Sequence, residues 1–295
     1  MKLIKKIYFK FLLLLGSLKK KLNIALKYKI KNFEILLTGD HALPIYKAQY
    51  SYYDLYLPNL VKYLKNNSSF IDIGCNCGDT FFNCYEENLK IKYYCVDAEI
   101  EFINLFKKNI IKNKNKLNLD KIHITNYLIG NKLSGFLKGS KGSKKLVKNK
   151  NSYSLKSTSL NDYVNLYNIE NISLLKIDTD GYDYNIINSG DKIILKNKPL
   201  IFFECYVPSK KQKINYLKIL DNLNLYGYDT FCVFDNYGKI LTKNCNKDHV
   251  SNLINYLYNN EKHQNYGSII YFDILAFLKK KHQILVDRSL KIYKN

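Results

Sequence analysis

The sequence predicts an α/β fold in which a doubly wound, mostly parallel sheet is flanked by helices. From residue 70 onward, short apolar runs alternate with amphipathic helical patterns, which is typical of βαβ units. The chain has 295 residues, of which 46% are hydrophobic, enough to bury a core. We expect an N-terminal helical extension at residues 1–39, a main domain at 40–278 and a basic C-terminal tail at 279–295.

Apolar runs bounded by turn residues define the expected elements in chain order. Strands are expected at Phe70–Ile73, Lys92–Val96, Ile122–Tyr127, Leu174–Asp178, Leu200–Glu204 and Asp273–Phe277. Helices are expected at Asp54–Lys65, Thr80–Asn88, Glu99–Asn109, Leu160–Tyr167 and Lys211–Leu223. A hairpin should start at Thr230–Phe234 with the turn Asp235–Gly238. The stretch Lys132–Ser152 is rich in Lys, Gly and Ser and is expected to be a mobile surface loop.

The chain is strongly basic, with a net charge of +22 from 47 Lys and Arg against 25 Asp and Glu. Nearly all of this charge is lysine, because Arg288 is the single arginine. Arginine is the residue suited to bidentate recognition of phosphates, so its scarcity weighs against a nucleic-acid partner. The seven cysteines lack the paired spacing and the nearby histidines of a zinc site. We expect buried thiols in a reducing cytoplasm and no structural metal.

The N-terminal segment 1–21 has the pattern of a basic amphipathic helix. Its apolar run Phe11–Leu15 is too short to span a bilayer, and three lysines follow it instead of a signal-peptide cleavage site. Such a helix suits peripheral contact with an anionic membrane, here the inner face. It also suits packing on its own domain or on an oligomer partner, and we favour packing. The oligomeric state is not defined by the sequence.

The segment Phe70–Thr80 (FIDIGCNCGDT) is the strongest ligand-binding signal in the chain. An apolar strand leads through a loop of small residues into a helix, the geometry that binds nucleotide-like ligands at the carboxyl end of a parallel strand. Its two glycines would let a ligand approach the backbone closely. The two aspartates that flank the loop would repel a pyrophosphate, and neither the dinucleotide fingerprint nor the phosphate-binding loop motif is present. The loop instead favours S-adenosylmethionine, which carries an ammonium, a sulfonium and ribose hydroxyls but no phosphate.

A further acid is placed to bind the ribose of such a cofactor. Asp97 ends the second expected strand, about 20 positions beyond the glycine loop, where an acidic residue commonly binds a ribose diol. Glu99 is the competing candidate, although it also suits the N-terminus of the next helix. The expected cofactor-binding residues are Asp72, Gly74, Asn76, Gly78, Asp97 and Asn126.

More acids follow the fourth and fifth strands. Asp178, Asp180 and Asp183 follow the apolar run that starts at Leu174, and Glu204 ends the next strand. Carboxyl ends of neighbouring parallel strands share one edge of a sheet, so these acids are expected at the rim of the same site. A turn that caps a helix would explain one of the three aspartates but not all of them. Glu204 could equally anchor a neighbouring loop.

With these residues in view, the chain resembles the FkbM family of methyltransferases over roughly Asp40 to Phe277. The resemblance implies a seven-stranded, Rossmann-like methyltransferase sheet and S-adenosylmethionine as the cofactor. This chain departs from the family pattern at Asp97 and Asp180, where glutamate is commoner, so the role of Asp180 stays open. The matching segments are Phe70–Thr80, Ser157–Tyr163, Leu175–Asp183 and Lys198–Glu204, in that order and spacing.

The resemblance to members found with bacterial surface-glycan genes implies O-methylation of a hydroxyl on a sugar or glycan precursor. A hydroxyl is a weak acid, so a carboxylate near the donor methyl should remove or orient its proton. Asp178 is the preferred base, with Asp180, Glu204 and His41 as alternatives. Two other functions are weighed: a methyltransferase acting on RNA, and a non-catalytic binding module on this fold. A divalent metal beside Asp178 is conceivable but lacks a full set of ligands.

Overall fold

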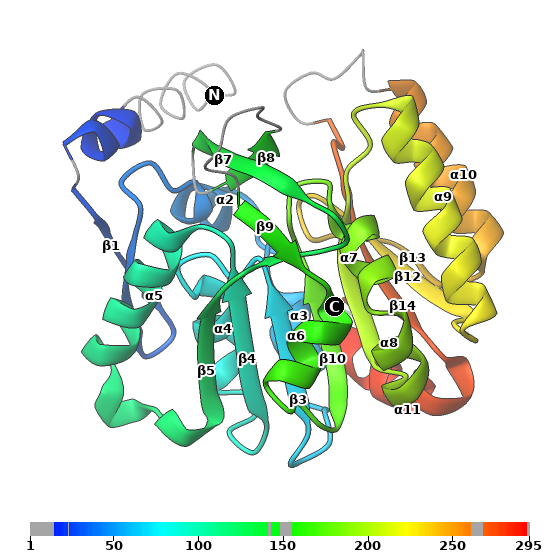
Figure 1. The fold of residues 1–295 in the computed structure, drawn as a ribbon, viewed down its shortest axis with the longest axis horizontal. Helices are drawn as coiled ribbons and strands as arrows, with labels where there is room; N and C mark the ends of the chain where they lie inside the picture. The colour runs from blue at the N-terminus through cyan, green and yellow to red at the C-terminus, as the bar shows by residue number, and fades with distance from the viewer. Residues whose placement is uncertain (1–14, 23, 141–142, 148–154, 261–267, 294–295) are drawn as a thin grey trace.

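The computed structural model describes residues 15–22, 24–140, 143–147, 155–260 and 268–293. A central sheet runs through the molecule with helices on both of its faces (Figure 1), which confirms the predicted fold class. Its strand order is β13-β12-β14-β11-β10-β3-β4-β5. The strands are β3 (Ser69–Ile73), β4 (Lys92–Asp97), β5 (Ile122–Asn126), β10 (Ile172–Ile177), β11 (Leu200–Cys205), β12 (Thr230–Asp235), β13 (Ile240–Cys245) and β14 (Phe272–Phe277).

Five adjacent strands of this sheet, from β11 to β5, are parallel, and the other three pair antiparallel. The sequence predicted seven strands, whereas the described residues form eight. The added strand is β13, which pairs with β12 across the predicted Asp235–Gly238 turn and lies at the sheet edge. The carboxyl ends of β3, β4, β10 and β11 lie at one edge, which is where ligands bind in sheets of this type.

Two apolar cores hold the helices to the sheet, one on each face. The core that contains Phe81, Phe106 and Val286 packs α3, α4, α5 and α11 against one face, and the core that contains Tyr163 and Ile219 packs the helices of the other. Each helix presents an apolar stripe to its core, as expected of an amphipathic helix. The helices are α2 (Leu43–Gln49), α3 (Tyr56–Val61), α4 (Asp79–Tyr85), α5 (Ile100–Lys112), α6 (Leu160–Leu166), α7 (Asp183–Ser189), α8 (Asp191–Asn197), α9 (Lys210–Leu225), α10 (Lys247–Asn260) and α11 (Lys279–Ser289), with short 3₁₀ turns at Lys114–Lys116, Leu119–Lys121 and Leu290–Tyr293.

The segment expected as a mobile loop at Lys132–Ser152 is instead a β-hairpin over the described part of its length, so that prediction is wrong. Strands β7 (Ser134–Ser140) and β8 (Ser143–Val147) pair antiparallel, and with β6 (Leu128–Ile129) and β9 (Leu155–Thr158) they form a second sheet. Glycines, which strands usually avoid, are required here by close packing. A Cβ on Gly139 would lie 2.1 Å from the Ser143 carbonyl oxygen.

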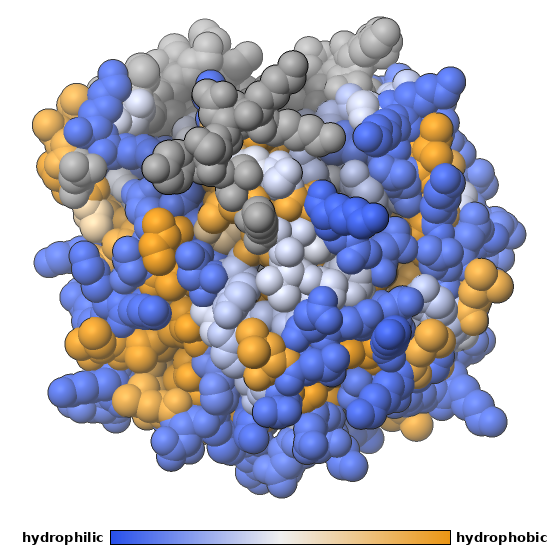
Figure 2. Space-filling model, viewed as in Figure 1, coloured by the Kyte–Doolittle hydropathy of each residue, from blue (hydrophilic) through white to orange (hydrophobic). Residues whose placement is uncertain are grey.

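The two ends of the chain also carry ordered structure. Within the expected N-terminal helix, residues 15–21 are helical and residues 1–14 lie outside the described residues. Strands β1 (Leu26–Ile30) and β2 (Phe33–Leu37) follow, form a two-stranded sheet and bury Phe33 and Ile35 in the core. The residues expected as a basic tail begin with α11, which buries Val286. Hydrophilic side chains cover much of one face of the molecule (Figure 2).

Candidate active site

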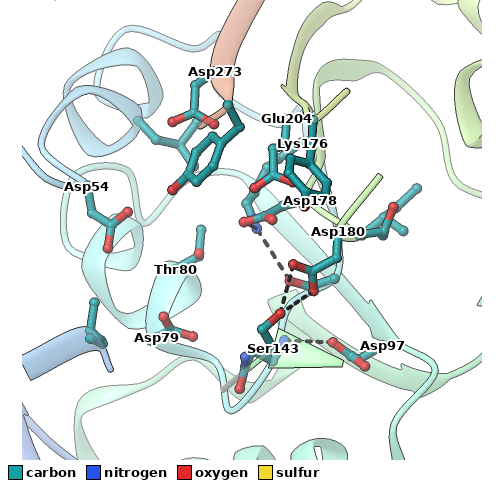
Figure 3. A pocket seen from close by; sticks show the side chains of 18 of the residues that line it. Asp54, Asp79, Thr80, Asp97, Ser143, Lys176, Asp178, Asp180, Glu204 and Asp273 are labelled. Carbon is teal, nitrogen blue, oxygen red and sulfur yellow. Dashed lines mark hydrogen bonds and ion pairs between the residues drawn. The ribbon is translucent and has the colours of Figure 1, made fainter. Parts of the chain in front are cut away.

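A cavity of about 670 Å³ opens at the carboxyl ends of β3, β4, β10 and β11. The glycine loop and the start of α5 line one side, and α2 with the segment that follows it lines the other. Residues of the β7–β8 hairpin line it as well. Carboxyl groups surround the open space (Figure 3). Those that line the cavity belong to Asp54, Asp79, Asp97, Glu99, Asp178, Asp180, Glu204 and Asp273.

The glycine loop has the expected backbone, but its glycines are required by the protein itself. Gly74 has φ of 82°, and a Cβ there would lie 1.9 Å from the Asp178 carbonyl oxygen. Gly78 has φ of 86° and does not line the cavity; a Cβ there would lie 2.3 Å from the ring of Phe106. These glycines therefore let α5 and the β10 loop pack against the cofactor loop, so our expectation that Gly78 admits a ligand is not supported.

Asp72 lies beneath the cavity and not in its lining, contrary to the expected direct contact with cofactor. It is 1% exposed and pairs with the ammonium of Lys176, whose Nζ lies 3.0 Å from its Oδ1. The two residues face each other on β3 and β10. Lys176 does line the cavity, lies 3.4 Å from Asp178 Oδ2 and donates a hydrogen bond to the Gly74 carbonyl oxygen. Lys176 thus connects the glycine loop to the acid expected to act as base.

Lys176 was missed from the sequence, although a signal for it was present. A lysine inside the apolar run Leu174–Ile177 must be buried, and a buried charge needs a partner. Burial by itself would lower the pKa of Lys176, but attraction to Asp72 and Asp178 outweighs burial and raises that pKa well above its usual value. The lysine is therefore a fixed positive charge at the base of the cavity.

Asp97 lies at the cavity wall, as predicted, and is held by backbone donors. Its Oδ2 accepts a hydrogen bond from the Asn76 N–H at 2.9 Å, and its Oδ1 accepts one from the Glu99 N–H at 2.8 Å. Burial raises the pKa of Asp97 to about 6, against the lowering effect of these two hydrogen bonds. Asn126 is exposed and outside the lining; its amide donates to the Asp97 carbonyl oxygen, so it supports the strand end instead of facing the cavity.

If Asp97 binds the cofactor ribose, as the sequence predicts, the Asp97→Asn substitution should weaken binding of S-adenosylhomocysteine roughly 10- to 100-fold, because it would remove a charge-assisted hydrogen bond to a ribose hydroxyl. The wild-type affinity should fall as the pH drops below about 6, since protonation of Asp97 competes with the ribose. The Asn variant should lose that pH dependence. Calorimetric titration between pH 5 and 8 measures both effects, and an unchanged pH profile in the variant would contradict this role.

His41 lies on the cofactor side of the cavity. Its Nδ1 accepts a hydrogen bond from the Leu43 N–H at 3.2 Å, and its side chain interacts with that of Asn76. Burial lowers the pKa of His41 to about 4, so the imidazole is neutral at physiological pH. These contacts indicate that His41 stabilises the turn at Asn76. They make it a poor candidate for the base that would accept the proton of the acceptor hydroxyl.

Asp180 is tied to the β7–β8 hairpin. Ser143 Oγ lies 2.8 and 2.7 Å from its two carboxylate oxygens, shown as dashed lines in Figure 3. On the same hairpin, Lys144 pairs with Glu99 at 2.8 Å and Glu101 at 2.9 Å. The hairpin is thus held at the cavity edge by contacts on two sides, to the loop after β10 and to the start of α5. Asp180, whose role the sequence left open, anchors it on the β10 side.

Glu204, which is buried, and Asp273, which is half-buried, form a pair of acids on neighbouring strands. They lie opposite each other in the antiparallel register of β11 and β14, and both line the cavity. Burial, followed by repulsion from Asp178, raises the pKa of each well above its usual value. A raised pKa favours the neutral form of each group, and that form can donate a hydrogen bond. Asp273 was missed because only the antiparallel insertion of β14 brings it beside Glu204.

Asp178 remains as the exposed carboxylate at the centre of the cavity. Its backbone N–H bonds to the Ile73 carbonyl oxygen, and its side chain is 51% exposed. Asp183, by contrast, is fully buried and accepts hydrogen bonds from Thr179 Oγ1 and the Glu204 N–H, so it supports the loop from behind. Within the described residues, no group of three or more His, Cys, Asp or Glu side chains is arranged to hold a metal ion.

The open sheet, its glycine loop and the cavity at its carboxyl edge define a doubly wound α/β protein with a ligand site at the carboxyl ends of its parallel strands. The chain belongs to the FkbM methyltransferase family, because the model of the methyltransferase FkbM domain matches residues 72–230, more than half of its length. This confirms the resemblance drawn from the sequence. A search of curated proteins gave no significant match.

Several solved structures are similar to this chain at low sequence identity. A human methyltransferase 10 domain-containing protein has a TM-score of 0.45 at 12% identity, covering 92% of this chain and 97% of its own. The FkbM methyltransferase from Methylobacillus flagellatus has a TM-score of 0.41 at 8% identity, covering 72% of this chain and 44% of its own. Precorrin-6y C5,15-methyltransferase from Geobacter metallireducens has a TM-score of 0.39 at 10% identity, covering 75% and 85%.

Proposed function

We propose that this chain is an S-adenosylmethionine-dependent O-methyltransferase that acts on a hydroxyl of a sugar or glycan precursor in the cytoplasm. The observation that carries the proposal is the position of Asp178. It lies where the cofactor loop meets a second half of the same cavity, which is lined by tyrosines and carboxyl groups. That arrangement suits a hydroxylated acceptor held beside a proton acceptor.

The residues present fit the cofactor. Asp97 faces the cavity with lone pairs beyond those used by its two backbone donors, which suits a ribose diol. Negative carboxylates such as Asp79 and Asp178 suit a sulfonium and an ammonium. The apolar side chains that would enclose an adenine are those of Phe102, Leu128, Ile129 and Leu133.

In the proposed reaction, the cofactor provides the methyl group and the protein provides the proton acceptor. S-adenosylmethionine supplies a methyl group that is already activated by its sulfonium. The acceptor oxygen would form a bond to the methyl carbon as the bond from that carbon to the cofactor sulfur breaks and S-adenosylhomocysteine leaves, and the acceptor proton would pass to the Asp178 carboxylate. Lys176, whose Nζ lies 3.4 Å from Asp178 Oδ2, would hold that carboxylate in place. Burial raises the pKa of Glu204, which favours its neutral form, and that form can donate a hydrogen bond to a neighbouring hydroxyl of the acceptor.

The proposal is tested by incubating the full chain with methyl-labelled S-adenosylmethionine and a pool of bacterial glycan precursors. Label that survives mild base and is recovered in an O-methyl sugar supports it. Label recovered on RNA in a parallel incubation, with binding that weakens steeply with salt, would replace it with the nucleic-acid alternative. Failure to bind S-adenosylhomocysteine at all would favour a non-catalytic module.

We also propose that the N-terminal segment makes peripheral contact with an anionic membrane. In its described part, Leu15, Leu18 and Leu22 are exposed beside three lysines, while Lys20 pairs with Asp40 at 3.1 Å on the body of the protein. No helix within the described residues is long and apolar enough to cross a bilayer. Flotation with phosphatidylglycerol vesicles should recover the full chain and not a variant that lacks residues 1–21. Equal recovery of the two proteins would exclude this contact.

A further inference from the structure

The half of the cavity opposite the cofactor loop has a wall of tyrosines. Ring contacts connect α2 and the segment after it to the β12–β13 turn, since the rings of Tyr50 and Tyr237 lie 4.3 Å apart and those of Tyr46 and Tyr53 lie 5.3 Å apart. The Tyr237 hydroxyl donates to the Ser268 carbonyl oxygen at 2.9 Å, which fixes the turn. This wall of the acceptor half is therefore built from aromatic side chains packed against one another, as the walls of small-molecule sites often are.

Acids line this half of the cavity as well. They are Asp54, Asp79, Asp178, Glu204 and Asp273. Lys47 approaches Asp54 only at 4.0 Å and does not line the cavity. The acceptor half is therefore lined by acids, although the chain as a whole has a net charge of +22.

Each cation in the described cavity lining already has a partner. Lys176 lies between Asp72 and Asp178. Lys144 is bound to two glutamates at the far side, and Lys145 lies 4.1 Å from the ring centroid of Tyr206. His41 is neutral, with its pKa lowered to about 4 by burial. A phosphate or carboxylate on the acceptor would thus be removed from water without a counter-charge, which is strongly unfavourable.

We infer that the acceptor is a hydroxylated molecule without negative charge near the methylated position, namely a neutral sugar or an amino sugar. Asp54 and Asp178 are exposed acids of this lining, and their carboxylates repel phosphorylated sugars and uronic acids and attract an ammonium group. The inference rests on the proposed function and narrows its substrate class. Among the described residues, the lysines that line the cavity are only Lys144, Lys145 and Lys176, so a partner attracted to the surface lysines need not be a substrate.

Four probes of one sugar framework test the inference with the full chain loaded with S-adenosylhomocysteine: methyl α-glucopyranoside, glucosamine, glucuronic acid and glucose 6-phosphate. Saturation-transfer NMR and competition titration measure binding at neutral pH. We expect the first two to bind and the two anions to bind more weakly by at least about tenfold, from repulsion by carboxylates at this range. The Asp54→Asn variant should reduce the difference in affinity between the neutral and the anionic sugars, whereas Asp120→Asn, at an exposed acid outside the cavity lining, should leave that difference unchanged.

The outcomes separate this inference from the proposed function. Binding of glucuronic acid or glucose 6-phosphate as tight as that of the neutral glycoside would overturn the inference alone. The same holds if the Asp54→Asn variant discriminates against the anionic sugars as strongly as the wild type does. If none of the four probes binds while S-adenosylhomocysteine does, the sugar acceptor itself is wrong, and both proposals fall.

Discussion

The Asp178→Asn variant is expected to lose about 10²–10⁴-fold in the rate of methyl transfer, the usual cost of a lost general base. Its affinity for S-adenosylhomocysteine should stay near that of the wild type. Asparagine keeps the size of the side chain and can accept a hydrogen bond, but it cannot accept a proton. Turnover and calorimetric affinity measured on the same preparation separate the two effects.

The structure favours Asp178 over the other acids for physical reasons. Asp180 is engaged by Ser143, and Glu204 is buried with its pKa raised well above its usual value. His41 is neutral and faces the cofactor loop. Asp178 alone among these four candidates is half exposed in the cavity and paired with a fixed cation, Lys176.

Asp180→Asn is the matched control, since it makes the same chemical change on the same loop. It should loosen the hairpin and reduce cofactor affinity more than the rate of the chemical step. Near-normal turnover by Asp178→Asn would mean that Asp178 is not the general base. Glu204 would then be the next candidate, or positioning of the two substrates would account for most of the rate enhancement.

The Lys176→Met variant is expected to lose about 3–5 kcal/mol of unfolding free energy, because it leaves Asp72 buried without its counter-charge. Lys176 and Asp72 are 5% and 1% exposed, so water cannot replace the missing partner. In the variant, loss of the counter-charge raises the pKa of Asp72 in the folded state, so that folding of the protein is coupled to protonation of Asp72. The variant should therefore regain stability as the pH is lowered toward the ordinary pKa of an aspartate.

Urea unfolding checks this prediction with two companion variants. The Lys176→Met/Asp72→Asn double variant should recover part of the loss, because it removes the unpaired charge. Lys247→Met breaks an exposed ion pair with Asp221, at 2.7 Å, and should change stability little. A loss in Lys176→Met no larger than that in Lys247→Met would show that the buried pair is not needed for folding.

Much of the fold was predictable because its signals are local. The glycine loop, the strand that ends at Asp97 and the acids after β10 each follow from residues within one βα unit. Family membership followed from the order of such units and is now confirmed. The hairpin at Ser134–Val147 was missed because its Gly, Ser and Lys residues have loop composition, and only packing of one strand on the other makes glycine suitable there.

The sequence by itself determined the sheet, the cofactor loop and the acids that follow its parallel strands, because periodicity and turn chemistry act between near neighbours. Only the tertiary structure decided what each acid does. It paired Asp72 with Lys176, tied Asp180 to Ser143 and placed Asp273 opposite Glu204, through contacts between residues far apart in the chain. Burial and charge at those contacts set the protonation of each group, and neither can be read from one strand alone.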